Sequence, residues 1–192
     1  FRQKLTRGKL IPESPMELML TDTQPPRSHD TKPIAFDKKG NMYIPFGAPS
    51  DCCQVSEGAP FSPGKDPCPL LETRGGIWKF DAGKPNQFQQ DGELFAGGFR
   101  SIVAIAWNNA DDHLYTIMHG RDYLHWNWPM YYTELEGAIL PSEEFFRIKK
   151  GDNAGWPYAY WDHLKNKKMQ APEYGGNGRM EAKDSSYLKP IV

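Results

Sequence analysis

A hairpin pattern that occurs twice constrains the fold more than any other feature of this chain. Residues 34–44 and 105–116 each contain an apolar run, a short polar turn and a second apolar run with a tyrosine, Tyr43 in the first copy and Tyr115 in the second. Two apolar runs around a short turn are typical of a β-hairpin. A repeat of such units predicts a β-propeller. The alternative is that two unrelated hairpins share a common pattern.

Other short apolar or alternating runs predict further strands. Alternation of apolar and polar residues is the mark of a half-buried strand. We expect strands at residues 16–20, 75–81, 93–96 and 143–148. The rest of the chain after residue 157 is expected to be rich in loops, with a flexible tip at 175–178.

The length predicts one partial domain over residues 1–192, with loops inserted at about 48–74 and 123–141. A blade with its loops takes roughly 40 to 50 residues, so the chain holds about three blades. An array of three blades leaves strand edges unpaired. We therefore expect the remaining propeller blades to lie outside this sequence, which would be a piece of a longer protein. A trimmed or processed terminus is the alternative to such a piece, and a different all-β fold is the alternative to the propeller.

The charge balance and hydropathy exclude some partners. The chain has 23 Lys and Arg against 24 Asp and Glu, so electrostatics give no argument for a nucleic acid or an anionic membrane surface. No stretch approaches the roughly 18 apolar residues of a membrane helix, and none is predicted.

Three cysteines lie in the first inserted loop. Adjacent cysteines seldom bond to each other, so either Cys52 or Cys53 is expected to form a disulfide with Cys68. Closing a loop of about 15 residues stabilises a fold by roughly 3 kcal/mol. Reduced thiols in a cytosolic protein are the alternative. Zinc is less favoured, because no Cys-x-x-Cys or His pair accompanies these residues.

Four segments resemble the sorbosone dehydrogenase and soluble glucose dehydrogenase family. They are His29 to Tyr43, which begins His-Asp-Thr-Lys-Pro-Ile-Ala-Phe; Gly98 to Ala104, with Gly-Phe-Arg-Ser; His119 to Asp122; and Glu143 to Pro157, with Glu-Glu-Phe-Phe-Arg-Ile and later Gly-Asp-Asn-Ala-Gly-Trp-Pro. Members of this family are six-bladed propellers that bind pyrroloquinoline quinone (PQQ) and calcium.

This resemblance implies an all-β fold with about three of six blades. It also implies a sugar dehydrogenase that oxidises a sugar hydroxyl or aldehyde by hydride transfer to PQQ. The implied partners are a sugar substrate and a cytochrome or quinone electron acceptor. Together with the expected disulfide, it implies a periplasmic or secreted protein.

The resemblance assigns catalysis to His29 and Arg100. A histidine with a pKa near 6.5 is suited to accept the hydroxyl proton. A guanidinium can hold quinone oxygens or a carboxylate. The family has Asn where this chain has Ser101, which changes the expected cofactor contact. The alternatives are a loop histidine that caps local backbone and an arginine in a surface ion pair.

The same resemblance places calcium at backbone carbonyls of Gly120 and Arg121, because calcium prefers oxygen ligands. The family commonly has Pro where this chain has Arg121, whose guanidinium is a further candidate contact to PQQ. Asp122 is an alternative carboxylate ligand. His119 either contacts the cofactor or merely ends its strand.

Aromatic residues mark the second insertion and the turn after residue 150. Trp126 and Trp128 either form a wall on which a sugar stacks or pack the insertion onto its own domain. Trp156 and Pro157 are expected to form a rigid turn with a buried ring.

Two other functional classes remain open from the sequence. A non-catalytic propeller, acting as a scaffold or binding module, fits the departures at Ser101 and Arg121. A calcium-dependent lactonase propeller would need Asp, Asn and Glu side chains converging on a central metal, and the sequence shows no comparable series.

Overall fold

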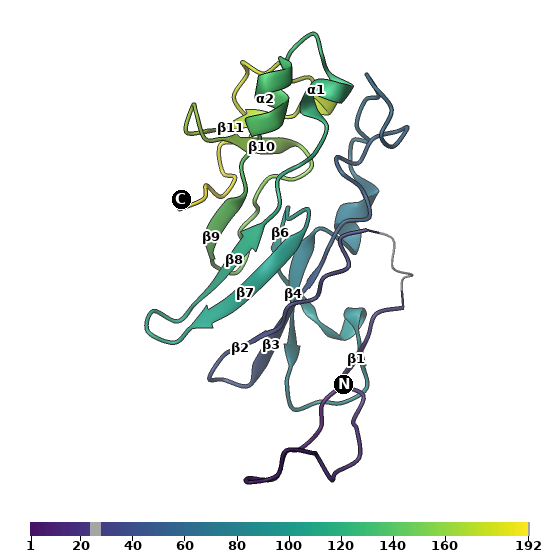
Figure 1. Cartoon of the computed structure of the whole chain (residues 1–192), viewed down its shortest axis with the longest axis vertical. Coiled ribbons are helices and arrows are strands. Elements are labelled where there is room, and N and C mark those ends of the chain that lie inside the picture. The colour runs from purple at the N-terminus through teal and green to yellow at the C-terminus, as the bar shows by residue number, and fades with distance from the viewer. Residues whose placement is uncertain (24–27, 192) are drawn as a thin grey trace.

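The computed structural model describes residues 1–23 and 28–191, and its regular secondary structure is mainly β-strand (Figure 1). The strands are β1 Leu20–Thr21, β2 Ala35–Phe36, β3 Asn41–Phe46, β4 Gly76–Asp81, β5 Gln87–Phe88, β6 Glu93–Gly97, β7 Ile102–Asn108, β8 His113–Met118, β9 Glu144–Ile148, β10 Ala159–Asp162 and β11 Lys167–Gln170. The helices are α1 Leu124–Asn127 and α2 Glu134–Ile139, with single 3₁₀ turns at Pro69–Glu72, Gln89–Asp91 and Pro172–Tyr174. The predicted all-β class is confirmed.

Two antiparallel sheets form the body of the molecule. The first has the strand order β2-β3-β4-β6, and the second has the order β7-β8-β9. In the first sheet Ala35 pairs with Tyr43, and in the second Ala106 pairs with Tyr115. The two hairpins of the repeat therefore share one register. The antiparallel hairpin β10-β11 is a third, smaller unit.

A hydrophobic core joins the two sheets. Ile77 from the first sheet and Leu114 and Phe146 from the second are fully buried there. Burial of each such side chain stabilises the fold by about 1.5–3 kcal/mol. The ring of Tyr43 stacks on that of Trp107 with centroids 5.1 Å apart. The two sheets thus pack face to face, as neighbouring blades must.

Two predictions of secondary structure are wrong. Of residues 16–20 only Leu20 is in a strand, because β1 is two residues long and pairs in parallel with β5, while Met16 is largely exposed. The hairpin β10-β11 was expected to be loop. All four residues of β10 are buried, so the period-two alternation that marks a half-buried strand is missing.

The first insertion carries a disulfide, as predicted, between Cys53 and Cys68. Cys52 is a free, buried thiol. The residues between Cys53 and Cys68 form no helix or strand, and the 3₁₀ turn at Pro69–Glu72 directly follows Cys68.

The second insertion contains α1 and α2, which the sequence analysis did not predict. Helix α2 begins with a capping box: the Thr133 hydroxyl accepts from the Glu136 amide at 3.2 Å, and the Glu136 carboxylate accepts from the Thr133 amide at 2.7 Å. Both insertions lie at the end of the sheets opposite the N-terminus (Figure 1). Among the described residues, no helix combines the length and the apolar character needed to cross a bilayer.

Candidate functional site

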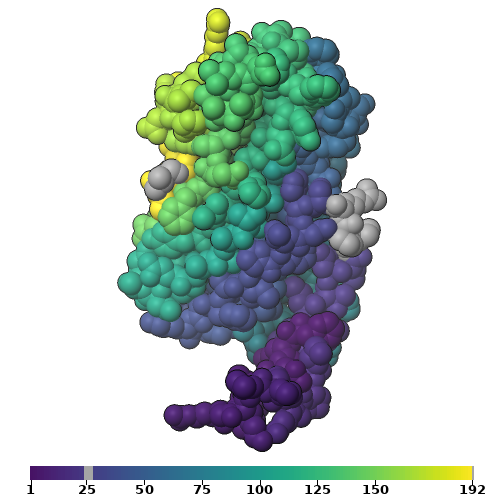
Figure 2. All heavy atoms as spheres, in the orientation of Figure 1, coloured from purple at the N-terminus to yellow at the C-terminus, as the bar shows by residue number. Residues whose placement is uncertain are grey.

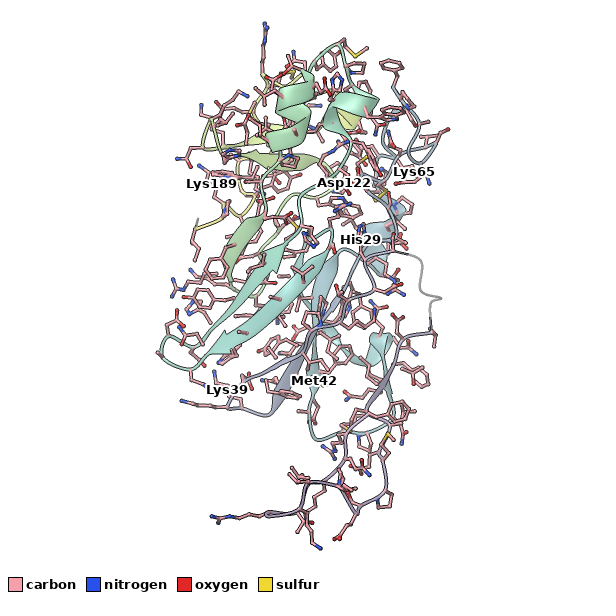
Figure 3. All side chains as sticks on the ribbon, viewed as in Figure 1. His29, Lys39, Met42, Lys65, Asp122 and Lys189 are labelled. Atoms are coloured by element: carbon pink, nitrogen blue, oxygen red, sulfur yellow. A yellow bond between two sulfur atoms is a disulfide. The ribbon has the colours of Figure 1, made fainter. Side chains whose placement is uncertain are left out.

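The predicted site residues gather at the end of the sheets that faces the insertions. Figure 3 shows His29 and Asp122 at this end, far from Lys39 and Met42. The repeat explains part of this arrangement. His29 stands five residues before Ile34, and Arg100 stands five residues before Ile105, its equivalent in the second hairpin. The structure thus presents the two residues from equivalent positions of successive sheets.

His29 is half-buried and fixed through one ring nitrogen. Its Nδ1 lies 2.5 Å from the carbonyl oxygen of Ala48. A carbonyl only accepts, so in the neutral ring Nδ1 carries the proton and Nε2 carries the lone pair. Burial lowers the pKa of His29, and the positive charge of Arg100 lowers it further, against the opposing bond to Ala48. The ring is therefore held neutral near pH 7 with a basic nitrogen at Nε2.

The backbone at His29 adopts the left-handed conformation, with φ at 58°. This conformation is uncommon for a residue with a side chain. The His29 backbone lies close to Gly47, which directly follows β3. A Cβ atom built on Gly47 would lie 2.2 Å from the His29 carbonyl oxygen. The absence of a side chain at Gly47 thus allows the His29 segment to lie against the first sheet.

Arg100 is buried, and its guanidinium is surrounded by oxygen atoms. One terminal nitrogen donates to the Gly120 carbonyl at 2.6 Å. The other lies 2.6 Å from a carboxylate oxygen of Asp122 and 2.7 Å from one of Asp51. The buried Nε of Arg100 has no hydrogen-bond partner among the described residues. The guanidinium is therefore held in place, while its Nε–H group has no acceptor in the described part of the chain.

Asp51 is a site residue that the sequence analysis missed. Its carboxylate accepts from the Asp122 amide at 2.9 Å, and its carbonyl accepts from the Trp156 indole at 2.7 Å. Burial raises the pKa of Asp51, although Arg121 and Arg100 oppose this effect. The only sequence signal was its place beside Cys52 in the loop predicted to carry a disulfide.

Arg121 points into the interior and is paired there. Its guanidinium forms a two-pronged ion pair with Glu173, whose carboxylate is fully buried. Although burial acts to raise the pKa of Glu173, Arg121 holds it below its ordinary value. The Trp128 indole also donates to Glu173, at 2.7 Å. The predicted contact between the Arg121 side chain and a cofactor would require this ion pair to open.

The remaining predicted residues are placed as follows. Ser101 is buried, and its carbonyl accepts from the His119 amide at 2.9 Å. His119 is exposed, with Nδ1 2.9 Å from a carboxylate oxygen of Glu143. The Gly120 carbonyl already accepts from Arg100. A small pocket runs between these residues and Trp156, whose ring is buried as predicted.

A metal at this end would depend on backbone oxygens. Among the described residues, no group of three or more His, Cys, Asp or Glu side chains lies close enough to hold one. The Gly120 carbonyl keeps a second lone pair after accepting from Arg100. The Asp122 side chain is 61% exposed and can turn toward a ligand.

Solved structures of similar fold come from enzymes of carbohydrate chemistry. No protein-family model and no curated protein matches this sequence. The holo form of the PQQ domain of pyranose dehydrogenase from Coprinopsis cinerea superposes with a TM-score of 0.63 at 15% identity, over 93% of this chain and 46% of that chain.

The iodide structure of a family AA12 carbohydrate-active enzyme from Trichoderma reesei gives a TM-score of 0.59 at 13% identity, over 91% of this chain and 45% of that chain. Its calcium structure gives 0.58 at 12% identity, over 84% and 42%. The chain therefore spans less than half the length of these proteins. The likeness confirms the predicted fold, part of a β-propeller.

The described site residues fit the quinone end of PQQ better than its carboxylate end. An ortho-quinone needs hydrogen-bond donors. The Nε of Arg100 is a donor without an acceptor among the described residues, but this atom is buried, so a quinone would reach it only if the segments around Arg100 moved. The three carboxylates of PQQ need cations. Arg100 and Arg121 are already opposed by Asp51, Asp122 and Glu173. The described residues thus offer the quinone oxygens one donor, in a buried position, whereas the carboxylates of PQQ require cations from elsewhere.

Proposed function

We propose that this chain supplies the His29–Arg100 part of a PQQ-dependent sugar dehydrogenase. One observation carries the proposal: successive sheets present a neutral histidine and a buried arginine at equivalent positions of one end. Burial and the Arg100 charge lower the pKa of His29, as a base that works near neutral pH requires. The structural likeness to the PQQ domain of pyranose dehydrogenase supports the same assignment.

Oxidation of a sugar hydroxyl removes a proton from oxygen and a hydride from carbon. His29 would accept the proton at Nε2, because Nδ1 is bonded to Ala48. The chemistry that PQQ supplies when bound is acceptance of the hydride, so the sugar loses two electrons. Arg100, once its buried Nε is uncovered, would donate to a quinone oxygen and stabilise the negative charge that arrives there. Gly120, Arg121 and Asp122 would offer oxygens to calcium.

The setting of the enzyme is part of the same proposal. The Cys53–Cys68 disulfide is typical of an oxidising compartment, which supports a periplasmic or secreted protein. A cytochrome or a soluble quinone would then take the electrons. The sugar pocket would be completed by propeller blades outside this chain.

A second candidate is a propeller that binds without catalysis. The internal pairing of Arg100 and Arg121 with carboxylates favours it, because neither guanidinium is left without a counter-charge. This candidate predicts no quinone binding, whereas the dehydrogenase predicts binding and reduction.

The natural protein that contains this chain can be titrated with PQQ in the presence of calcium and followed by visible absorption. We expect bound quinone that is reduced when an aldose is added. His29→Gln should keep PQQ bound but slow reduction by about 10²- to 10⁴-fold, the usual worth of a general base. His125 is a matched control, since its Nδ1 also bonds to a carbonyl, that of Tyr132, at 2.8 Å.

His125→Gln should leave the rate of reduction unchanged. Equal loss in both histidine variants would contradict the role of His29. Failure of the natural protein to bind PQQ would favour the non-catalytic propeller.

A further inference from the structure

Four aromatic side chains lie exposed on the insertions beside the candidate site. Tyr123 is 61% exposed, Trp126 69%, Tyr131 42% and Phe61 52%. All six tryptophans belong to the described residues, and Trp126 alone is exposed among them. We call these four residues the aromatic platform. Figure 2 shows the segment with three of them on the surface at the end opposite the N-terminus.

The platform has a rigid base. Leu124 and Asn127, on the other face of α1, are completely buried. The Phe61 amide donates to the Asn127 carbonyl at 3.1 Å, which ties the first insertion to the second. The half-buried Trp128 ring is stacked on Tyr131, with centroids 6.0 Å apart and 11° between planes, and meets the Phe61 ring edge-on, with centroids 6.1 Å apart. Exposed rings on such a base lose little freedom when a ligand binds.

The platform is continuous with the candidate site along the chain. Tyr123 directly follows Asp122, whose carboxylate bonds to Arg100 at 2.6 Å. Tyr123 also has φ at 58°, a conformation that is unfavourable for a bulky residue. Strained backbone of this kind gathers at ligand sites, where the surrounding structure maintains it. Here it turns an aromatic ring outward beside the Arg100 network.

We propose that the aromatic platform binds pyranose rings of an oligosaccharide whose terminal unit reaches His29 and Arg100. This inference rests on the proposed function, and it names a chain of sugars as the substrate class. The C–H face of a pyranose packs against the electron-rich face of an aromatic ring. Large exposed rings in water are otherwise unfavourable, and such patches mark binding sites. Continuity with Arg100 favours a sugar chain over a docking protein.

The test uses calorimetric titration of the natural protein, without PQQ, with hexaoses of glucose, xylose and mannose units and with free glucose. We expect at least one hexaose to bind at least tenfold more tightly than glucose. Trp126→Ala should weaken that binding tenfold or more, and Tyr131→Ala should weaken it less. Trp126→Phe should restore most of it, because the ring face is kept.

Leu135 on α2 is a matched control, since it is as exposed as Trp126, at 69%. Leu135→Ala should leave hexaose binding unchanged. Absence of binding by every hexaose would overturn the proposal. Equal weakening by Leu135→Ala would also overturn it, because the loss would then not depend on the aromatic ring. A dimer that dissociates in the Trp126→Ala variant would overturn it too, because the surface would then be a protein interface.

PQQ titration of the same samples separates the two proposals. Hexaose binding without PQQ binding would support sugar binding at the aromatic platform and contradict the proposed dehydrogenase. PQQ binding without hexaose binding would support a dehydrogenase that acts on small sugars and would contradict sugar binding at the aromatic platform.

Discussion

His29 and Arg100 occupy equivalent positions of two repeated sheets, yet their surroundings differ. His29 is half-buried, and its ring makes one bond, to the Ala48 carbonyl. Arg100 is buried among the Gly120 carbonyl and the carboxylates of Asp51 and Asp122. The Ala48 amide donates to the Arg100 carbonyl at 2.9 Å, so the two segments are also joined through backbone.

The difference shows how a repeated fold acquires one site. The hairpin repeat brings both residues to the same end of the molecule. The carboxylates around Arg100 come from loops that the repeat does not contain, the disulfide loop and the segment after β8. The repeat therefore determines where His29 and Arg100 lie, and the loops determine which charges surround them.

Removal of the Arg100 guanidinium should have the largest effect. Arg100→Ala leaves Asp122 without its cation and leaves Asp51 with only the more distant Arg121, 3.9 Å away, and loss of one partner of a buried pair costs about 3–5 kcal/mol. Because Asp122 is largely exposed, we expect a loss near 3 kcal/mol in the free energy of unfolding, measured in urea. The control Arg147→Ala removes a surface pair with Asp111 and should cost less than about 1 kcal/mol. Similar losses of unfolding free energy in both variants would show that the ion pairs of Arg100 stabilise the fold no more than a surface pair does.

Loss of the disulfide should destabilise the fold almost as much. The bridge joins residues 15 apart, and a loop of that length is stabilised by roughly 3 kcal/mol. Replacement of Cys53 and Cys68 by Ser should lower the free energy of unfolding by about that amount. It should also loosen Asp51, two residues before Cys53.

The matched variant is Cys52→Ser, which removes a buried thiol but no bridge. It should cost clearly less than the double replacement. If it costs as much, the stabilising feature is the thiol near Glu173 and not the disulfide.

A methyl group at Gly47 should disturb His29 without touching Arg100. The added Cβ would lie 2.2 Å from the His29 carbonyl oxygen, so Gly47→Ala should cost about 1–3 kcal/mol through crowding. Gly97→Ala is the control, because a Cβ there would meet nothing within 4 Å. Proton–nitrogen NMR should show the His29 ring signals shifted in the first variant only. Unshifted His29 signals would show that the segment relaxes freely.

The titration of His29 should have the smallest effect. Its pKa in the folded protein lies below the ordinary 6.5, so the unfolded chain binds the proton more readily. The contribution of His29 to stability is therefore present above pH 6.5 and is lost as the pH falls through the folded pKa. His29→Gln should remove this part of the pH dependence of unfolding. An NMR midpoint for His29 at or above 6.5 would contradict the assignment.

The local elements and the repeat could be predicted from the amino-acid sequence. Apolar runs around polar turns predicted β2-β3 and β7-β8, and their equal registers at Tyr43 and Tyr115 follow from that pattern. The disulfide loop was also visible in the spacing of cysteines. These features depend on residues close together in the chain, whose period and turn chemistry express backbone geometry directly.

The tertiary structure alone decided which charges meet. Asp51 reaches Arg100 across 49 residues, and Glu173 reaches Arg121 across 52. Tertiary packing also determines that Cys53, and not Cys52, bonds to Cys68, and that β10 is buried on both faces. No local pattern encodes such pairs, because loops that are free in the unfolded chain are brought together only when the sheets pack. The sequence thus determined the frame of this site, and long-range packing determined its electrostatics.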